Sequence, residues 1–413
     1  MYRVWYSTEG FADYIIKNTI LSTKHPMKNR IYESDANNPR NFHSVPDHIR
    51  KILYLDAPDL IVEMNNEPIF AIEVSKEAGT GHNVFQRFAR IAAAVENNVP
   101  AFYIYPEAVI IQRKGQRTRW DKINPLIFRT LEAVMNLYSV PALLYYFPSD
   151  FQQNSLNPSD SPNKSNKGLK FDRQIGFEDC PDSLSDSMQK LFNALDEVIC
   201  TIEQYGVGEG RKKLLDNMFI SQQKEYMLRQ FNEKSHNEDI DKMSPLSAVK
   251  QLPTRCLLDY LSKYEKNNYK IGELLRTREY SIIYQINARF RGDPYAGALA
   301  AIDYLKCREG RTFEDRRNNL ILVFGKILID EDQKLAIIDE NGDTINDFFK
   351  DVQACSNYNL LLKNYQDLRT REISRYLMQV RYGSTFSKLK HIRVYSYFAD
   401  AIIFPDGALW RDN

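Results

Sequence analysis

Residues 57–105 decide the fold of this chain. They read APDLIVEMNNEPIFAIEVSKEAGTGHNVFQRFARIAAAVENNVPAFYIY. Residues 60–64 and 69–74 are short apolar runs with many β-branched side chains, and the turn-prone pair Asn65-Asn66 separates them. Such runs around an Asn-rich turn predict an antiparallel hairpin.

A helix and a third strand follow the hairpin. Gly79 and Gly81 interrupt the second strand, and apolar residues then recur at helical spacing over residues 85–95. Residues 101–105 are again continuously apolar. The order strand, crossover helix, strand predicts an α/β fold, in which helices flank a mixed sheet.

Three charged side chains converge at one end of this predicted hairpin. Asp59 opens the first strand, Glu73 lies near the end of the second, and Lys76 comes just after it. Carboxylate oxygens are the ligands that Mg²⁺ takes from proteins, and an ammonium group can steady a developing negative charge. These residues suit metal-assisted hydrolysis of a phosphodiester, with Asp59 and Glu73 as metal ligands.

The pattern resembles the PD-(D/E)xK nuclease superfamily, which includes most type II restriction endonucleases. The match consists of Pro58-Asp59, then Glu73-Val74-Ser75-Lys76, and a following helix that carries Gln86. The resemblance implies a restriction-endonuclease-like fold and a Mg²⁺-dependent DNA nuclease. In this family an acidic residue on the preceding helix sometimes joins the metal site, and Glu9 is the candidate here. A carboxylate that only stabilises the start of that helix, predicted over residues 10–21, is the alternative.

The spacing departs from the family pattern, which separates acid and lysine by one residue. Two residues intervene here, so Ser75 stands where the lysine is expected. In a regular strand Glu73 and Ser75 share a face and Lys76 points away. Either a β-bulge turns Lys76 toward the site, or its role is weakened. A third interpretation is an ordinary strand whose charges are solvated.

Two basic segments are candidates for DNA contacts. Residues 113–120 carry Arg113, Lys114, Arg117 and Arg119 around a glycine turn, next to a strand predicted over residues 109–112. Residues 287–319 carry a second set, which includes Arg289, Arg291, Arg308 and Arg311. Such cations suit phosphate or base contacts. A solvated hairpin tip is the alternative for the first segment, and pairing with nearby acids is the alternative for the second.

Composition limits the class of protein. The net charge is only +1, so any DNA binding must come from local patches. The five cysteines are scattered without a CxxC pair, which favours reduced thiols, and the histidines show no zinc spacing. We find no signal peptide and no apolar run long enough to cross a membrane, and therefore expect a cytoplasmic protein without a membrane partner.

The length of 413 residues predicts more than one domain. Residues 148–170 are rich in Pro, Ser and Asn and predict a linker between a catalytic domain, 1–147, and a DNA-recognition domain, 171–413. The second domain should be mainly helical, with helices over 183–204, 210–232, 257–266 and 277–290, and a small sheet. Asp400 and Asp406 could form a second metal pair, but without a lysine motif a packed C-terminal turn over residues 404–410 is the preferred interpretation.

These observations predict a sequence-specific type II restriction endonuclease that cuts double-stranded DNA with Mg²⁺. We expect a homodimer, because both strands must be cut, and a cognate DNA methyltransferase encoded nearby. A repair or phage-defence nuclease without a fixed site is one alternative. A non-catalytic DNA-binding protein with a decayed motif is the other.

Overall fold

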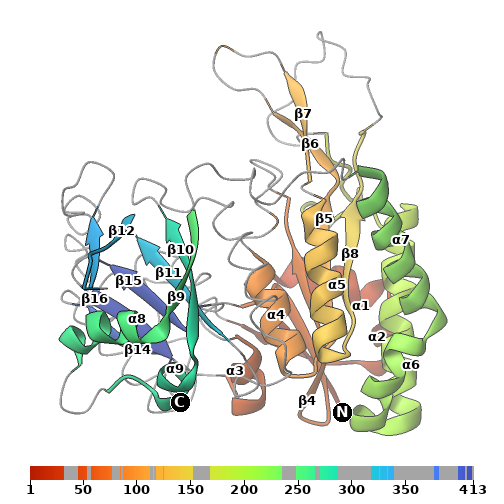
Figure 1. Ribbon diagram of the computed structural model, residues 1–413. Helices are drawn as coiled ribbons and strands as arrows, with labels where there is room; N and C mark the ends of the chain where they lie inside the picture. Colours follow the sequence, from red (N-terminus) through yellow and green to blue (C-terminus); the bar gives the residue numbers. More distant parts are fainter. Residues whose placement is uncertain are drawn as a thin grey trace, which may run out of the picture. The chain divides into compact units, whose positions relative to one another are not determined.

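The structure is a computed structural model of the whole chain. It describes residues 1–31, 45–53, 57–76, 84, 87–111, 115, 118–123, 125–151, 168–234, 248–265, 270–286, 318–324, 326–332, 334–338, 376–380, 399–404 and 407–411. The chain divides into two compact units, which Figure 1 shows in the colours of the sequence. Unit 1 comprises Met1–Glu33, Val45–Leu53 and Ala57–His236, and unit 2 comprises Ser34–Ser44, Tyr54–Asp56 and Asn237–Asn413.

Unit 1 holds the predicted hairpin. Its elements in chain order are β1 (Tyr2–Tyr6), α1 (Glu9–Lys17), α2 (Leu21–Lys24), β2 (Met27–Arg30), α3 (Asp47–Leu53), β3 (Leu60–Met64), β4 (Glu67–Val74), α4 (Phe88–Glu96), β5 (Ala101–Pro106), β6 (Ala108–Ile111), β7 (Arg119–Lys122), α5 (Leu126–Tyr138), β8 (Ala142–Phe147), α6 (Asp186–Lys213), the 3₁₀ turn η3 (Leu214–Asp216) and α7 (Met218–Lys234).

The six strands β2-β1-β3-β4-β5-β8, in that order, form the main sheet of unit 1. The sheet is mixed: β3 runs antiparallel to β1 and β4, whereas β4, β5 and β8 are mutually parallel. Helices α3, α4 and α5 cover one face, and α1 and α6 cover the other. The predicted α/β class with a mixed sheet flanked by helices is therefore confirmed.

The hairpin forms as the sequence predicts, because its turn has the required chemistry. Asn65 and Asn66 both adopt left-handed backbone, with φ of 53° and 64°. Two successive left-handed residues make the turn whose twist matches a two-residue hairpin, and Asn tolerates that conformation. The pairing register shifts between Val62 and Glu63 and is regular from there toward Asp59.

Residues 52–55 are apolar and aromatic, and from this composition alone they predict the first strand of the sheet. That prediction is wrong for residues 52 and 53, which lie in helix α3, and residues 54 and 55 are outside the described residues. Ile49, Ile52 and Leu53 are buried at helical spacing, and the first turn closes on the carbonyl of Pro46. The place beside β3 in the sheet is taken instead by β1, which the sequence analysis did not predict.

The long helices that follow the Pro/Ser/Asn-rich segment belong to unit 1 and not to a second domain. Helix α6 packs on β4 and β8, and α7 lies against α5 and along β8. Gln223 of α7 donates to the carbonyl of Leu144, and the amide of Leu144 donates to the sulfur of Met227. Helix α7 therefore covers the open edge of the sheet. The structure places the division near residue 236, and residues 148–170 join two parts of unit 1.

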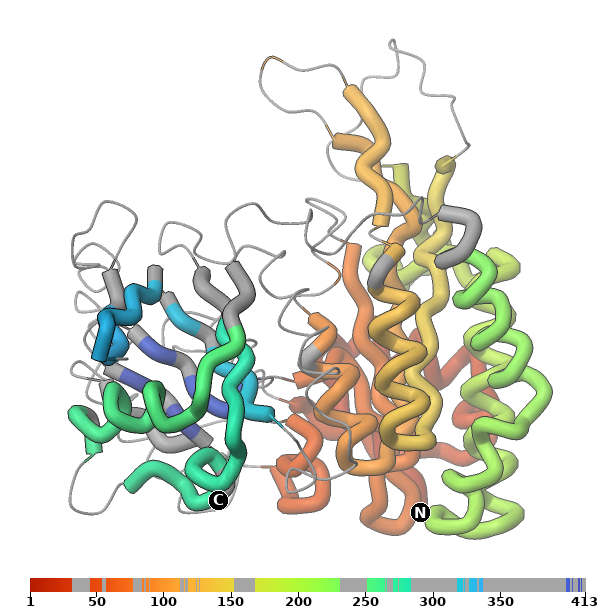
Figure 2. The backbone as a smooth tube through the Cα atoms, viewed as in Figure 1, coloured from red at the N-terminus to blue at the C-terminus, as the bar shows by residue number. Residues whose placement is uncertain are grey.

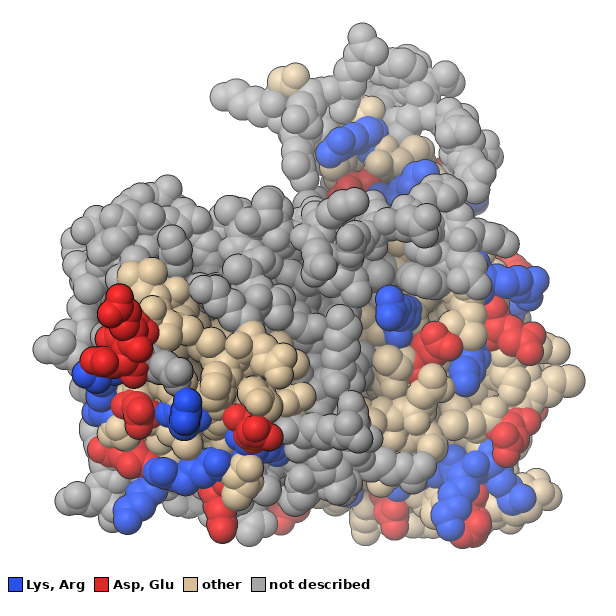
Figure 3. All heavy atoms as spheres, viewed as in Figure 1, with Lys and Arg blue, Asp and Glu red and all other residues tan. Residues whose placement is uncertain are grey.

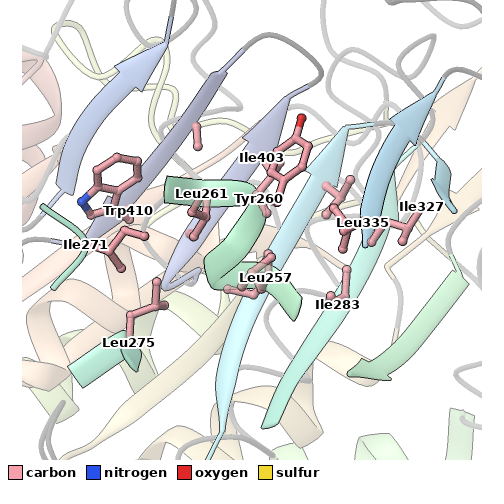
Figure 4. Close-up of a cluster of buried hydrophobic side chains, with 14 residues drawn as sticks. Leu257, Tyr260, Leu261, Ile271, Leu275, Ile283, Ile327, Leu335, Ile403 and Trp410 are labelled. Atoms are coloured by element: carbon pink, nitrogen blue, oxygen red, sulfur yellow. The ribbon is translucent and has the colours of Figure 1, made fainter. Parts of the chain in front are cut away.

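Unit 2 contains a second mixed sheet, ordered β14-β16-β15-β11-β10-β9. Its described elements are β9 (Ala248–Pro253), α8 (Thr254–Leu261), the 3₁₀ turn η5 (Ser262–Tyr264), α9 (Glu273–Thr277), β10 (Tyr280–Ile286), β11 (Asn319–Phe324), β12 (Lys326–Ile329), β13 (Leu335–Ile338), β14 (Tyr376–Val380), β15 (Ala401–Phe404) and β16 (Gly407–Arg411). Figure 4 shows Leu257 and Leu261 of α8 in the apolar cluster that also contains Ile403 and Trp410.

The mainly helical character expected for the second domain does not hold for the part of unit 2 that the structure describes. A helix is expected over residues 277–290, but residues 280–286 form strand β10, hydrogen-bonded to β9 on one side and β11 on the other. Residues 287–290 lie outside the described residues. Ser281 and Ile283 are fully buried, and this alternation fits a strand. Among the described residues, no helix is both long and apolar enough to cross a membrane.

Candidate active site

Strand register brings Asp59 and Glu73 together. Leu60 pairs with Ile72, so the next positions outward on these antiparallel strands are Asp59 and Glu73. Directly opposed residues share a face of the sheet and have neighbouring Cβ atoms. Both carboxylates thus lie at the edge of the sheet where β4 ends, on the face covered by α4. The predicted convergence of these two residues is a feature of the structure.

Only one carboxylate oxygen of Asp59 has a hydrogen-bond partner among the described residues. Its Oδ2 accepts a hydrogen bond of 2.8 Å from the amide of Val74, and its Oδ1 has no partner among the residues that the structure describes. Burial raises the pKa of Asp59, and the neighbouring Glu73 carboxylate raises it further, to about 7. Arg90, the Val74 amide and Arg87 act in the opposite direction. Asp59 should therefore gain or lose its proton near neutral pH.

Glu73 is fully buried and is held by two arginines of the crossover segment. The Nη1 atom of Arg90 donates to both carboxylate oxygens, at 2.9 and 2.8 Å. Arg87 donates to Oε1 at 2.6 Å. The arginine side chains differ in exposure: 1% for Arg90 and 30% for Arg87. A buried carboxylate needs such partners to remain ionised.

Lys76 does not join the carboxylates. The ladder between β4 and β5 stays regular to its end, where the amide of Ser75 donates to the carbonyl of Ile104 at 2.9 Å. No bulge therefore turns Lys76, and its Nζ lies 2.9 Å from Oδ1 of Asp179. Ser75 is buried on the strand face that carries Glu73. Of the two alternatives for this motif, the structure has the regular strand.

Of the other predicted site residues, the structure describes Glu9 and Arg119. Glu9 stands at the start of α1, close in sequence to Ser7, whose amide donates to the Asp59 carbonyl. Its own carboxylate pairs with Lys28 at 2.8 Å, which lowers the pKa of Glu9. Arg119 is exposed on β7. The remaining predicted residues lie outside the described part of the chain: Gln86, Arg113, Lys114, Arg117, Arg289, Arg291, Arg308 and Arg311.

Asp400 has a structural role in unit 2. It is buried, and its Oδ2 accepts a hydrogen bond of 2.7 Å from the amide of Leu320. Its Oδ1 lies 3.4 Å from Nη1 of Arg278. These contacts anchor the start of β15 to β11. Asp406 lies outside the described residues.

A second buried carboxylate, Glu63, lies toward the other end of β3. Its Oε1 accepts from Arg3 at 2.6 Å, and its Oε2 lies 3.0 Å from the indole nitrogen of Trp5 and 2.7 Å from Nε2 of His48. Both oxygens are used by side chains of β1 and α3, so this cluster ties the helix to the sheet.

The sequence analysis missed Arg87 and Arg90. Their signal was available, because arginines three residues apart on a helix lie on one side of it. The apolar residues around them, such as Phe88 and Ile91, are buried against the sheet. Two cations beside such a stripe, on a helix that crosses the strand of Glu73, indicate a buried acidic partner.

Comparisons with known protein families, with curated proteins and with solved structures found no match. Within the described residues there is also no group of three or more Asp, Glu, His or Cys side chains arranged to hold a metal ion. The paired carboxylates Asp59 and Glu73, with the side chains that surround them, are therefore the candidate active site.

Proposed function

We propose that this protein is a Mg²⁺-dependent DNA endonuclease with a restriction-endonuclease-like catalytic unit. The observation that carries the proposal is the pair Asp59 and Glu73, opposed on neighbouring strands at the end of β4, with the pKa of Asp59 raised to about 7. Ionisable groups perturbed by burial and by a like charge are concentrated at functional sites. The match to the PD-(D/E)xK pattern supports the same assignment.

Two carboxylates are enough to bind Mg²⁺, but they are too few for a metal ion whose ligands all come from the protein. Mg²⁺ is usually bound by one or two carboxylates, with waters and substrate phosphates completing its shell. Oδ1 of Asp59 has no partner among the described residues. Burial is the main cause of the raised pKa of Asp59, and the negative charge of Glu73, which a divalent cation would offset, raises it further. When bound, Mg²⁺ would polarise the scissile phosphate and make water a stronger nucleophile.

The chain's own residues prepare this chemistry. The Val74 amide holds the Asp59 carboxylate in place through Oδ2. Arg90 holds both oxygens of Glu73 from the first turn of α4, so the orientation of that carboxylate is set before any ligand arrives. Preorganisation of this kind reduces the cost of reaching the transition state.

DNA is the proposed substrate because a basic arm extends from the same end of the sheet. Strands β6 and β7 follow directly after β5 and project beyond the sheet of unit 1 (Figure 2). Arg119 and Lys122 are exposed on this arm, and Figure 3 shows basic side chains there. Cations beside a phosphodiester site suit contacts with the DNA backbone.

We assign sequence recognition to unit 2, cleavage of both strands to a homodimer, and protection of host DNA to a cognate methyltransferase. This is the arrangement of a type II restriction endonuclease. A cytoplasmic location suits the free thiols at Cys180, Cys200 and Cys256, which a reducing compartment preserves.

The experiment is plasmid cleavage by the full chain in Mg²⁺, compared with Asp59→Asn and Glu73→Gln. Asp179→Asn is the matched control, because it neutralises an exposed carboxylate that pairs with Lys76. We expect discrete fragments from the wild type and the control, and none from the site variants. Cleavage that survives in both site variants would refute the assignment. Fragments of all sizes would identify a nuclease without a fixed site.

One observation favours a second candidate, a non-catalytic DNA-binding protein. Both oxygens of Glu73 are engaged by arginines, and Ser75 replaces the family's lysine on the inner face. This candidate requires that Glu73 never release a partner to a metal. Calorimetric titration with Ca²⁺ separates the two candidates, because only the nuclease has a divalent-cation site that Asp59→Asn removes.

A further inference from the structure

Glu73 has two arginine partners of different kinds. Arg90 lies inside the first turn of α4 with only 1% of its side chain exposed, and it contacts both carboxylate oxygens. Arg87 lies just before the helix, has 30% of its side chain exposed, and contacts Oε1 alone. A buried, doubly bonded ion pair is costly to break, whereas a partly exposed single contact exchanges readily.

The charges near Glu73 leave Arg87 in conflict with a bound cation. Arg90 already provides Glu73 with one full counter-charge. Arg87 adds a second, while Asp59 has a backbone amide as its only hydrogen-bond donor among the described residues. If Asp59 and Glu73 held a divalent cation, the cation would need an oxygen of Glu73 and would be repelled by the positive charge of Arg87. Arg87 thus occupies the place beside Glu73 that the positive charge of a bound metal ion would take.

We propose that Arg87 is the exchangeable partner of Glu73 and the catalytic cation of this site. It neutralises Glu73 when no metal is bound, and with metal and DNA present its guanidinium moves to a non-bridging oxygen of the scissile phosphate. This inference rests on the proposed nuclease function. A guanidinium is suited to the task, because its planar fork matches phosphate oxygens and its charge stabilises the transition state. Lys76, the cation expected from the family pattern, pairs with Asp179 instead.

The first test is metal binding without DNA. Ca²⁺ is titrated calorimetrically into the full-length wild type, Arg87→Gln and Arg87→Lys, with Arg129→Gln as the control that removes an exposed positive charge from α5. If Arg87 competes with the cation, Arg87→Gln should bind Ca²⁺ about tenfold more tightly. Arg87→Lys and Arg129→Gln should stay near the wild type. Unchanged or weaker binding by Arg87→Gln would overturn the exchange.

The second test is single-turnover DNA cleavage at saturating Mg²⁺. Arg87→Gln should be about a hundredfold slower than the wild type, and Arg87→Lys should recover part of the rate. Tighter metal binding combined with slower cleavage is not expected of a residue that only supports the fold. A wild-type rate in Arg87→Gln would refute the catalytic role.

The two proposals fail in different ways. If the wild type binds Ca²⁺ but cuts no DNA, the nuclease proposal and the transfer to phosphate fall together. Tighter Ca²⁺ binding by Arg87→Gln would then still uphold the exchange at Glu73. If the wild type cuts DNA and both Arg87 variants match it in both tests, only the inference about Arg87 fails.

Discussion

Replacing Asp59 by Asn should stabilise unit 1 above neutral pH while it abolishes DNA cleavage. The side chain is nearly isosteric, and its carbonyl oxygen can still accept the hydrogen bond from Val74. What is lost is a negative charge that burial and Glu73 make unfavourable. Residues selected for function often reduce stability in this way.

The magnitude follows from the pKa of Asp59, which rises from 3.8 to about 7. One pKa unit corresponds to about 1.4 kcal/mol, so ionised Asp59 costs the fold at most about 4 kcal/mol. Because Asp59 keeps some solvent access, we expect about 2 kcal/mol of stabilisation in Asp59→Asn.

The sign is set by the order of ionisation. The pKa of Asp59 is higher in the folded chain, so the unfolded chain loses this proton first as pH rises. Wild-type stability therefore falls, relative to Asp59→Asn, between about pH 4 and pH 7 and stays lower above that range. Near pH 4 the two proteins should be almost equally stable.

The assay is urea unfolding at pH 5, 7 and 9. The chain has two units, so the unfolding of the β3–β4 hairpin must be measured separately. Hydrogen exchange with mass spectrometry monitors it, and the exchange rates are corrected for their intrinsic dependence on pH. Asp179→Asn is the control, since its exposed carboxylate should contribute less than about 1 kcal/mol at any pH. If Asp59→Asn is no more stable than the wild type at pH 9, the inferred cost of an ionised Asp59 in this buried position beside Glu73 is wrong.

Three further predictions follow from the same contacts. Glu73→Gln should destabilise unit 1 by about 3 kcal/mol in urea unfolding, because it removes the carboxylate whose two oxygens the buried Arg90 contacts. An unchanged midpoint would contradict this. Lys76→Ala should cut DNA at close to the wild-type single-turnover rate, because Lys76 pairs with an exposed carboxylate. A cleavage rate reduced about a hundredfold would show that Lys76 is catalytic after all. Replacing Arg119 and Lys122 by Glu should weaken DNA binding and make the affinity less dependent on salt, as measured by fluorescence anisotropy. If the affinity of this variant depends on salt as strongly as that of the wild type, the β6–β7 arm does not contact DNA.

Local sequence determined the hairpin, the crossover helix and the following strand. Strand β3 has the predicted bounds, and β4, α4 and β5 lie within a few residues of the predicted ranges. These elements depend on short-range causes: apolar periodicity and an Asn-Asn turn whose left-handed backbone suits a two-residue hairpin. The pairing of Asp59 with Glu73 also needs the register shift between Val62 and Glu63, which the sequence did not predict. The register that pairs Glu63 with Pro68 would otherwise place Asp59 opposite Ile72.

Long-range packing decided what local patterns could not. Residues 52 and 53 fit a strand by composition, but β1 takes the place beside β3, and α3 buries them as part of a helix. The segment 148–170 has the composition of a linker, yet α6 and α7 beyond it pack on the sheet of unit 1, because its faces and the edge at β8 require cover.

The candidate site shows the same division at the level of single side chains. The alternation of a strand left open whether Ser75 or Lys76 faces Glu73, and the regular ladder from β4 to β5 decided for Ser75. The sequence contains Arg87 and Arg90, but only the packing of α4 across β4 shows that they hold Glu73. Ion pairs between distant elements depend on where helices cross strands, and that geometry is set by the packing of the whole unit rather than by residues near each other in the chain.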